Sequence, residues 1–249
     1  MTQALTPREL AARIEHRVEG PLTRNRVRQL CQEADEFGFG TVSVPSAWVT
    51  HAKICLHQKE VAVSTTIGFP YGDVLSSAKF EEAYTAVNVG ASEITFMLNH
   101  EYALEDATML SQERRCIEAL IRACRKVRPT VVKVMINVTT LTKDQFKQLV
   151  QMVLETGADF IGIFGASDGR HHVGIDPIGS LRALIGDQMN IVVWNDDLDR
   201  MTDESSEEGP TDLRHGFAIS FLEQGAQRLI TTRGPGILRT AKQLAAHAG

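Results

Sequence analysis

Short runs of apolar residues alternate with longer amphipathic stretches along almost the whole chain. In the stretch 24–37, for example, Val27, Leu30 and Ala34 recur at helical spacing and fall on one face. Similar spacing predicts helices at 76–89, 111–127, 143–156, 177–184 and 211–224. The short runs predict strands near 14–18, 41–44, 61–66, 93–98, 131–137, 158–163, 190–194 and 227–231.

The alternation of strand and helix predicts a parallel barrel. A strand followed by a helix leads to a parallel neighbour, because the helix makes the crossover. Eight such units in 249 residues favour a closed barrel over an open, doubly wound sheet. In 89–94, 156–161 and 224–230 a helix ends at a glycine and the chain enters a strand. We therefore expect one domain, residues 1–249, folded as a (β/α)8 TIM barrel.

Two segments add to this pattern. The first residues predict a helix before the first strand and no signal peptide, with Thr6 as N-cap, Pro7 at the first helical position and Glu9 three residues after the cap. Residues 196–212, after the seventh strand, form an acidic and polar insertion. It is either a solvated loop or a lid, because barrel active sites lie on the loops that follow the strands.

Composition narrows the class of protein. Hydrophobic residues make up 43% of the chain, which is enough for a large core without covalent staples. The 4 cysteines form no Cys-x-x-Cys pair, which is typical of reduced thiols and indicates neither a zinc site nor a disulfide framework. The net charge is -5, with no basic excess for nucleic acid, and no apolar run could span a membrane. We expect a cytoplasmic protein without a cofactor.

Several motifs resemble the deoxyribose-phosphate aldolase family. The most specific is Ile67-Gly68-Phe69-Pro70-Tyr71-Gly72, and the others occur in the order and spacing of that family over nearly the whole chain. These other motifs lie at 14–16, 21–23, 30–34, 41–49, 89–94, 132–137 and 157–161. The resemblance implies a barrel that cleaves a carbon–carbon bond in a small carbonyl or sugar-phosphate compound, and it implies a homodimer.

The chain departs from the family pattern at the catalytic positions. In the family, a lysine on the sixth strand forms an imine with the substrate, a second lysine on the seventh strand lowers its pKa, and an aspartate on the fourth strand moves protons. Here these positions hold Gly162, Trp194 or Asn195, and Thr95. The family's imine mechanism is therefore not expected at its usual place. Two hypotheses follow: a divergent carbon–carbon lyase with another mechanism, or an inactive pseudoenzyme that binds a metabolite or a protein.

Four residues are candidates for catalysis. Lys133 shares one strand face with Met135 and Asn137, and Thr95 stands where the resemblance implies the aspartate. Lys133 either forms a relocated imine or is a buried lysine paired with a carboxylate such as Glu15. His100, after the fourth strand, is either a general base or an exposed loop residue.

Two further groups follow strands at the catalytic end of the barrel. The family resemblance implies that Thr231, Thr232, Arg233 and Gly234 bind a phosphate; the alternative is a polar turn. The family's glycine pair after the seventh strand is replaced by acidic residues, including Asp196 and Asp197.

Asp168, His171 and His172, together with the two aspartates after the seventh strand, contain metal-ligand side chains. Their spacing matches no compact motif, and the alternative is a solvated loop. We predict no metal site.

Overall fold

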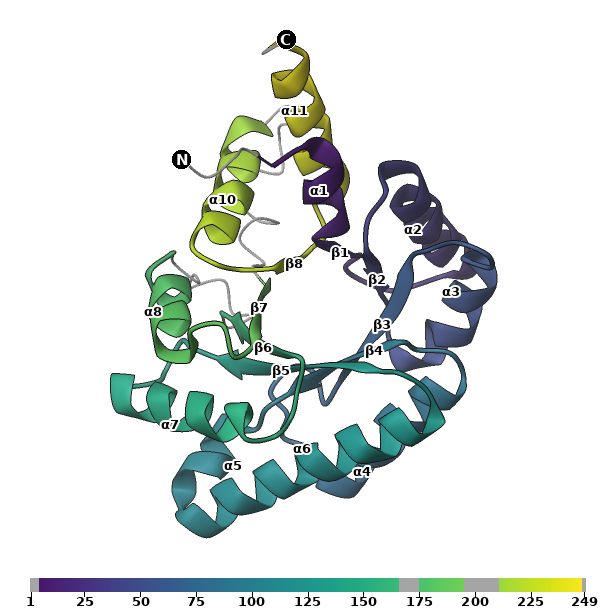
Figure 1. Ribbon diagram of the computed structural model, residues 1–249. Coiled ribbons are helices and arrows are strands. Elements are labelled where there is room, and N and C mark those ends of the chain that lie inside the picture. Colours follow the sequence, from purple (N-terminus) through teal and green to yellow (C-terminus); the bar gives the residue numbers. More distant parts are fainter. Residues whose placement is uncertain (1–4, 166–174, 195–210, 248–249) are drawn as a thin grey trace.

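The chain folds into a closed barrel of parallel strands in the order β1 to β8, each paired with the next and β8 paired with β1 (Figure 1). This computed structural model describes residues 5–165, 175–194 and 211–247. The strands are β1 (Ile14–Arg17), β2 (Thr41–Ser43), β3 (Ala62–Ile67), β4 (Glu93–Met97), β5 (Val131–Asn137), β6 (Phe160–Phe164), β7 (Asn190–Trp194) and β8 (Arg228–Thr231). The predicted (β/α)8 architecture is confirmed.

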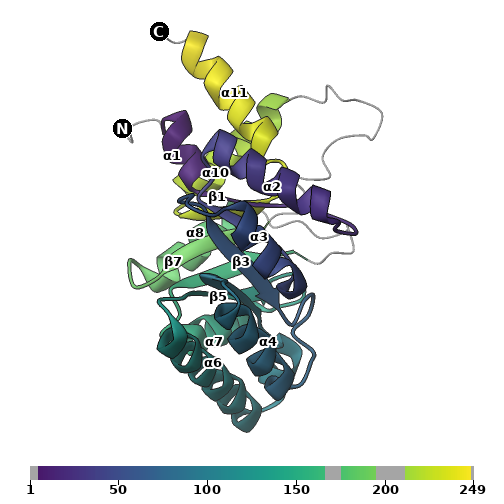
Figure 2. The same cartoon turned by 90° about the vertical axis from the view of Figure 1, so that its right-hand side faces the viewer.

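Helices surround the barrel (Figures 1 and 2). They are α1 (Pro7–Ala12), α2 (Arg24–Phe37), η1 (Ser46–Trp48), α3 (Val49–Cys55), α4 (Ser76–Asn88), α5 (His100–Glu105), α6 (Ala107–Val127), α7 (Lys143–Leu154), α8 (Ile175–Ile185), α10 (Thr211–Glu223) and α11 (Gly234–His247). Helices α1 and α11 pack together, so both ends of the described chain lie on one side of the molecule (Figure 2).

The start of α1 follows from local chemistry. The Thr6 hydroxyl accepts a hydrogen bond from the Glu9 backbone N–H, and the Glu9 carboxylate accepts one from the Thr6 backbone N–H, so two otherwise unsatisfied N–H groups gain partners. Pro7 fits the first turn because it has no N–H to lose. The predicted N-terminal helix is confirmed.

Strands β4 to β8 divide their side chains between two cores, because successive residues point to opposite faces. On β5, Val132 and Val134 belong to the large core between the strands and the helices. Met135 belongs instead to a second apolar cluster, whose members come from β4 to β8. The second cluster lies inside the barrel and sets the limits of any site there.

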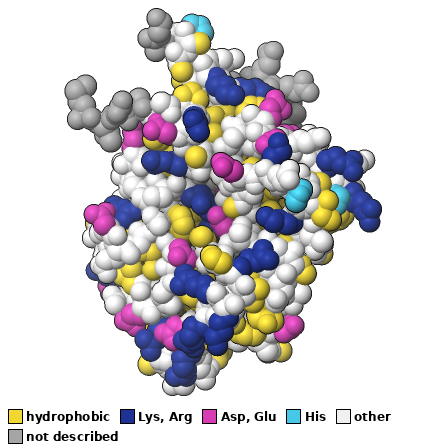
Figure 3. All heavy atoms as spheres, turned by 45° about the vertical axis from the view of Figure 1, so that its right-hand side comes forward, with side chains coloured by type: hydrophobic (Ala, Val, Ile, Leu, Met, Phe, Trp, Pro, Cys, Tyr) yellow, Lys and Arg dark blue, Asp and Glu magenta, His cyan; other side chains and the backbone are white. Residues whose placement is uncertain are grey.

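The prediction differed from the structure mainly in the helices. It missed α3, η1 and α5, which are short, and it gave no bounds for α11. It also began α6 four residues late, because the helix starts after the Asp106 cap. Residues 196–210 of the acidic insertion lie outside the described residues, and α10 begins at Thr211. On the surface, acidic and basic side chains are interspersed with apolar ones (Figure 3).

Candidate functional site

Lys133 lies at the centre of a buried charged cluster near the N-terminal ends of the strands. Its side chain is fully buried, and its Nζ donates hydrogen bonds to Glu15, to Glu93 at 2.8 Å and to Ser64 at 3.1 Å. Glu15 is also fully buried. The ammonium is therefore held by two carboxylates and a hydroxyl, which is the structural role that sequence analysis offered as one alternative.

Arg228 balances the second carboxylate of this cluster. Its guanidinium forms an ion pair with Glu93 and lies 3.9 Å from the nearer Glu15 oxygen. Burial alone would raise the pKa of Glu93, but the charges of Lys133 and Arg228 and their hydrogen bonds outweigh it and hold that pKa below its ordinary value. Two cations thus offset two carboxylates, and the cluster is close to neutral.

Apolar side chains fill the barrel interior around Gly162, the position at which the resemblance implies an imine lysine. A Cβ added to Gly162 would overlap the sulfur of Met135, and it would lie 2.8 Å from the Met135 methyl carbon and 2.9 Å from Val192 Cγ1. Met97, Phe164, Trp194 and Ile230 complete the cluster, with Phe160 packed against it. The space that a side chain at position 162 would need is already occupied.

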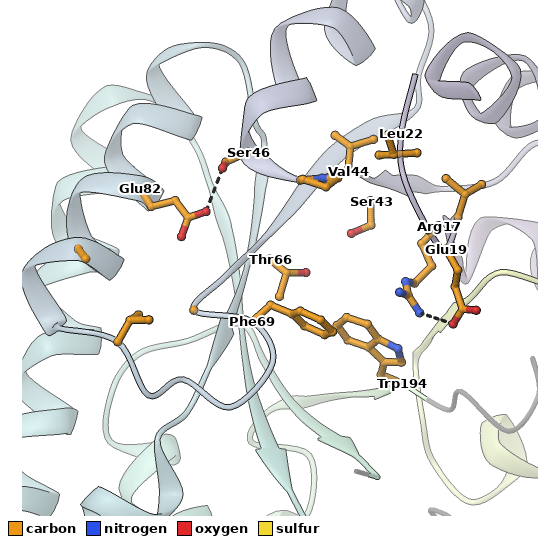
Figure 4. Close-up of a pocket in the computed structure, with 16 residues that line it drawn as sticks. Arg17, Glu19, Leu22, Ser43, Val44, Ser46, Thr66, Phe69, Glu82 and Trp194 are labelled. Carbon is orange, nitrogen blue, oxygen red and sulfur yellow. Dashed lines mark hydrogen bonds and ion pairs between the residues drawn. The ribbon is translucent and has the colours of Figure 1, made fainter. Parts of the chain in front are cut away.

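A cleft with a volume of about 680 Å³ opens above this apolar cluster (Figure 4). Arg17, Ser43, Thr66 and Trp194 line it from the C-terminal ends of β1, β2, β3 and β7. That end is where barrels carry their active sites. The volume lies within the range of small-molecule sites, roughly 300–1,000 Å³.

The cleft combines an aromatic wall with a guanidinium. The Arg17 Cζ lies 4.6 Å from the Trp194 ring centroid. The Phe69 ring stacks on the Trp194 ring, with 5.6 Å between the two centroids (Figure 4). Glu19 forms a 3.7 Å ion pair with Arg17 at the rim. The site can hold a ligand that has an apolar face and an anionic group.

The loop that carries Phe69 packs against a buried ion pair between Lys79 and Glu113. Lys79 Nζ donates to Glu113 Oε1 at 2.7 Å and lies 4.5 Å from the Phe96 ring centroid. Gly68 has a φ of 71°, and a Cβ there would lie 3.1 Å from Lys79 Cδ, so the glycine permits both the turn and the close packing. These contacts fix one wall of the cleft.

The predicted catalytic residues do not converge on this cleft. Thr95 is buried beside Lys133 in the sheet, and its Oγ1 lies 3.4 Å from Ser64 Oγ, within the charged cluster. Asn137 lies at the far end of β5, where its Oδ1 accepts from the Thr139 N–H at 3.0 Å.

His100 was expected in a loop, but it is the buried first residue of α5. Burial lowers its pKa, and the adjacent Glu101 opposes that shift. His100 Nε2 lies 3.3 Å from Glu101 Oε1, so the two residues interact at the start of the helix.

The predicted anion-binding residues lie at the N-terminus of α11. Thr231 is buried, and its hydroxyl accepts a hydrogen bond from the Arg233 N–H at 3.0 Å. A Cβ added at Gly234 would lie 2.8 Å from the Phe39 ring, so only glycine fits there without a shift. Sheet pairing places Thr231 beside His16, the neighbour of Arg17, so the turn and the cleft share one rim of the barrel. A helix N-terminus and two arginines are suited to an anion.

The suggested metal ligands Asp168, His171, His172, Asp196 and Asp197 lie outside the described residues. Within the part of the chain that the structure describes, no group of three metal-ligating side chains occurs. In the same part, no helix is long and apolar enough to cross a bilayer.

Sequence analysis missed Arg17, Glu93 and Arg228. The period of two along β1 places Arg17 on the same face as Glu15, and this signal could have identified Arg17 as an inward-facing residue. Glu93 and Arg228 each begin a strand, and only the pairing register shows that they reach the height of Lys133.

Known proteins resemble this chain over nearly its full length. A deoxyribose-phosphate aldolase from Carboxydothermus hydrogenoformans is 28% identical over 241 residues, which are 93% of this chain and 94% of that protein. One from Deinococcus radiodurans is 28% identical over 231 residues, which are 92% and 95% of the two chains. No family model matches the chain. The resemblance that the motifs indicated is confirmed.

Solved structures share the fold. The aldolase QR15 superposes with a TM-score of 0.78 at 22% identity and covers 96% of this chain and 97% of its own. The deoxyribose-phosphate aldolase from Aeropyrum pernix, described as a tetramer, gives a TM-score of 0.77 at 20% identity and covers 96% and 93%. At these identities the likeness shows the barrel alone.

Proposed function

We propose that this barrel, a relative of proteins named deoxyribose-phosphate aldolase, binds a small anionic metabolite in the cleft without forming an imine. The observation that carries the proposal is the filled barrel interior: Met135 occupies the space beside Gly162, and Lys133 is buried beneath it in a charged cluster. The Lys133 Nζ is fully buried and already engaged by two carboxylates and a hydroxyl, whereas imine formation needs an amine that the carbonyl compound can reach.

The chemistry of the cleft favours a sugar-phosphate-like ligand. Arg17 offers a planar guanidinium for a phosphate or carboxylate, and the helix N-terminus at 231–234 lies on the same rim. The Trp194 and Phe69 rings offer an apolar wall, and Ser43 and Thr66 offer hydroxyl groups. A polyol with one anionic end matches this combination.

Binding can be measured through Trp194 itself. The chain has 2 tryptophans, so the variant Trp48→Phe leaves Trp194 as the reporter in the cleft. Fluorescence is titrated with deoxyribose 5-phosphate and, in parallel, with deoxyribose. We expect saturable quenching by the phosphorylated sugar and weaker binding of the neutral sugar.

Arg17→Gln in the same background should weaken binding of the phosphorylated sugar by roughly tenfold or more, as expected for a charged hydrogen bond. Arg122→Gln is the matched control, because the Arg122 side chain is 67% exposed on α6. An equal effect of both substitutions, or binding unaffected by Arg17→Gln, would contradict the proposal.

Carbon–carbon lyase activity is the second candidate, favoured by the names of the relatives and by a cleft at the catalytic end of the barrel. It would proceed without the family's lysine. Cytoplasmic location and a homodimer stay predictions from the sequence.

A further inference from the structure

Two thiols from neighbouring helices meet on the outer layer of the barrel. Cys31 lies on α2 and Cys55 ends α3, and these two helices pack against each other. The Cys31 thiol donates a hydrogen bond to the Ala52 carbonyl at 3.8 Å. Ala52 precedes Cys55 by three residues and shares its helix face, so the Cys31 sulfur sits beside the Cys55 side chain, with which it interacts.

His51 completes this group one turn before Cys55. Its Nε2 lies 3.8 Å from the Cys55 sulfur and 3.3 Å from the Arg24 carbonyl oxygen. A carbonyl only accepts hydrogen bonds, so Nε2 carries its one hydrogen toward the Arg24 carbonyl, and the Cys55 sulfur lies at the side of the same N–H group. The imidazole therefore places a polar N–H edge beside the Cys55 sulfur.

The two cysteines differ in access. Cys55 is half-buried, whereas Cys31 is 2% exposed. Burial, with Cys55 nearby, raises the pKa of the Cys31 thiol to about 12. An oxidant from solvent therefore meets Cys55 first, and Cys31 remains a protonated thiol next to the product of that reaction.

We propose that Cys55 is a peroxide-reactive cysteine and that Cys31 resolves it as an intramolecular disulfide. The Cys55 thiolate attacks one oxygen of a hydroperoxide, the O–O bond breaks, and the sulfur is oxidised to a sulfenic acid while the other oxygen leaves as water or an alcohol. The Cys31 sulfur then attacks the Cys55 sulfur. The Cys31 proton leaves with the displaced hydroxyl as a second water, and the S–S bond remains.

The disulfide would join α2 to the end of α3. Helix α3 directly follows η1, whose Ser46 lines the cleft and donates to Glu82 at 2.9 Å. The pair thus lies on an element that continues into the cleft wall. The chemistry proposed for the thiols is independent of what the cleft binds.

The test is oxidation of the full chain with hydrogen peroxide, followed by intact mass and peptide mapping. We expect a loss of two hydrogens and a cross-linked peptide joining Cys31 to Cys55. In Cys31→Ser, and in Cys31→Ala in case the serine variant folds poorly, dimedone should trap a sulfenic acid at Cys55. His51→Asn should slow oxidation of Cys55 by roughly tenfold, because it removes the imidazole N–H edge beside the sulfur.

Cys116 on α6 is the internal control, because it is also half-buried and burial raises its pKa. In the wild-type chain it should react more slowly than Cys55 in the same sample. Two outcomes would overturn the proposal: equal rates at Cys55 and Cys116, or oxidation of Cys55 to the sulfinic acid with no link to Cys31.

Discussion

Removing the charge of Lys133 tests the buried cluster most sharply. Lys133→Met replaces a fully buried ammonium with an apolar chain of similar length and leaves Glu15 fully buried beside Glu93. Among the described residues, the second Glu15 oxygen has no hydrogen-bond partner, so without Lys133 this buried carboxylate would also lose the donor to its first oxygen. Breaking a buried ion pair from one side costs about 3–5 kcal/mol, and we expect a loss of that size in the free energy of unfolding.

A second substitution separates charge from packing. Adding Glu15→Gln to Lys133→Met removes the uncompensated carboxylate, so we expect the double variant to regain at least about half of the loss. Urea unfolding followed by circular dichroism gives the four free energies needed, those of the wild type, the two single variants and the double variant. Lys147→Met is the control, since that side chain is 60% exposed and should change stability by less than about 0.5 kcal/mol. A loss below about 1 kcal/mol in Lys133→Met, or a double variant as unstable as the sum of the singles, would refute this reasoning.

Three further predictions concern packing and pH. Gly162→Ala should lower stability by about 1–3 kcal/mol in thermal unfolding, and Met135→Ala should destabilise the Gly162→Ala chain less than it destabilises the wild type, because it vacates the space that the new methyl group needs. Because the pKa of Glu93 is lowered in the fold, its carboxylate stabilises the fold at pH values above its ordinary pKa of 4.5, and this contribution is lost as the pH falls through the lower folded pKa. Glu93→Gln should therefore make the urea midpoint depend less on pH over that acidic range. The lowered pKa of His100 means that unfolding takes up a proton once the pH is below the ordinary value of 6.5, so urea midpoints should fall as the pH drops through that value, and less so in His100→Gln.

The sequence predicted the barrel well because strand signals are local. The run at 131–137 is apolar and β-branched, and β5 has those bounds. Helix ends were less predictable, since α6 begins where the Asp106 side chain accepts from two backbone N–H groups, a contact that apolar periodicity does not report.

The site depended on information that one strand does not contain. Alternation along β1 and β5 was enough to suggest the contact between Glu15 and Lys133. Arg228 joins that cluster only through the register between β7 and β8, and the fit of Met135 beside Gly162 only through the register between β5 and β6. The periodicity of the sequence shows which side of a strand a residue faces, whereas the pairing register between strands shows at which level of the barrel its side chain lies.

Borohydride trapping tests the central claim most directly. The chain is incubated with deoxyribose 5-phosphate, reduced and weighed intact, with an authentic deoxyribose-phosphate aldolase treated in parallel. We predict no covalent adduct on this chain, together with saturable quenching of Trp194 by the same compound. A mass gain that maps to Lys133 would contradict the account, because it would show that the buried lysine leaves its two carboxylates and forms an imine.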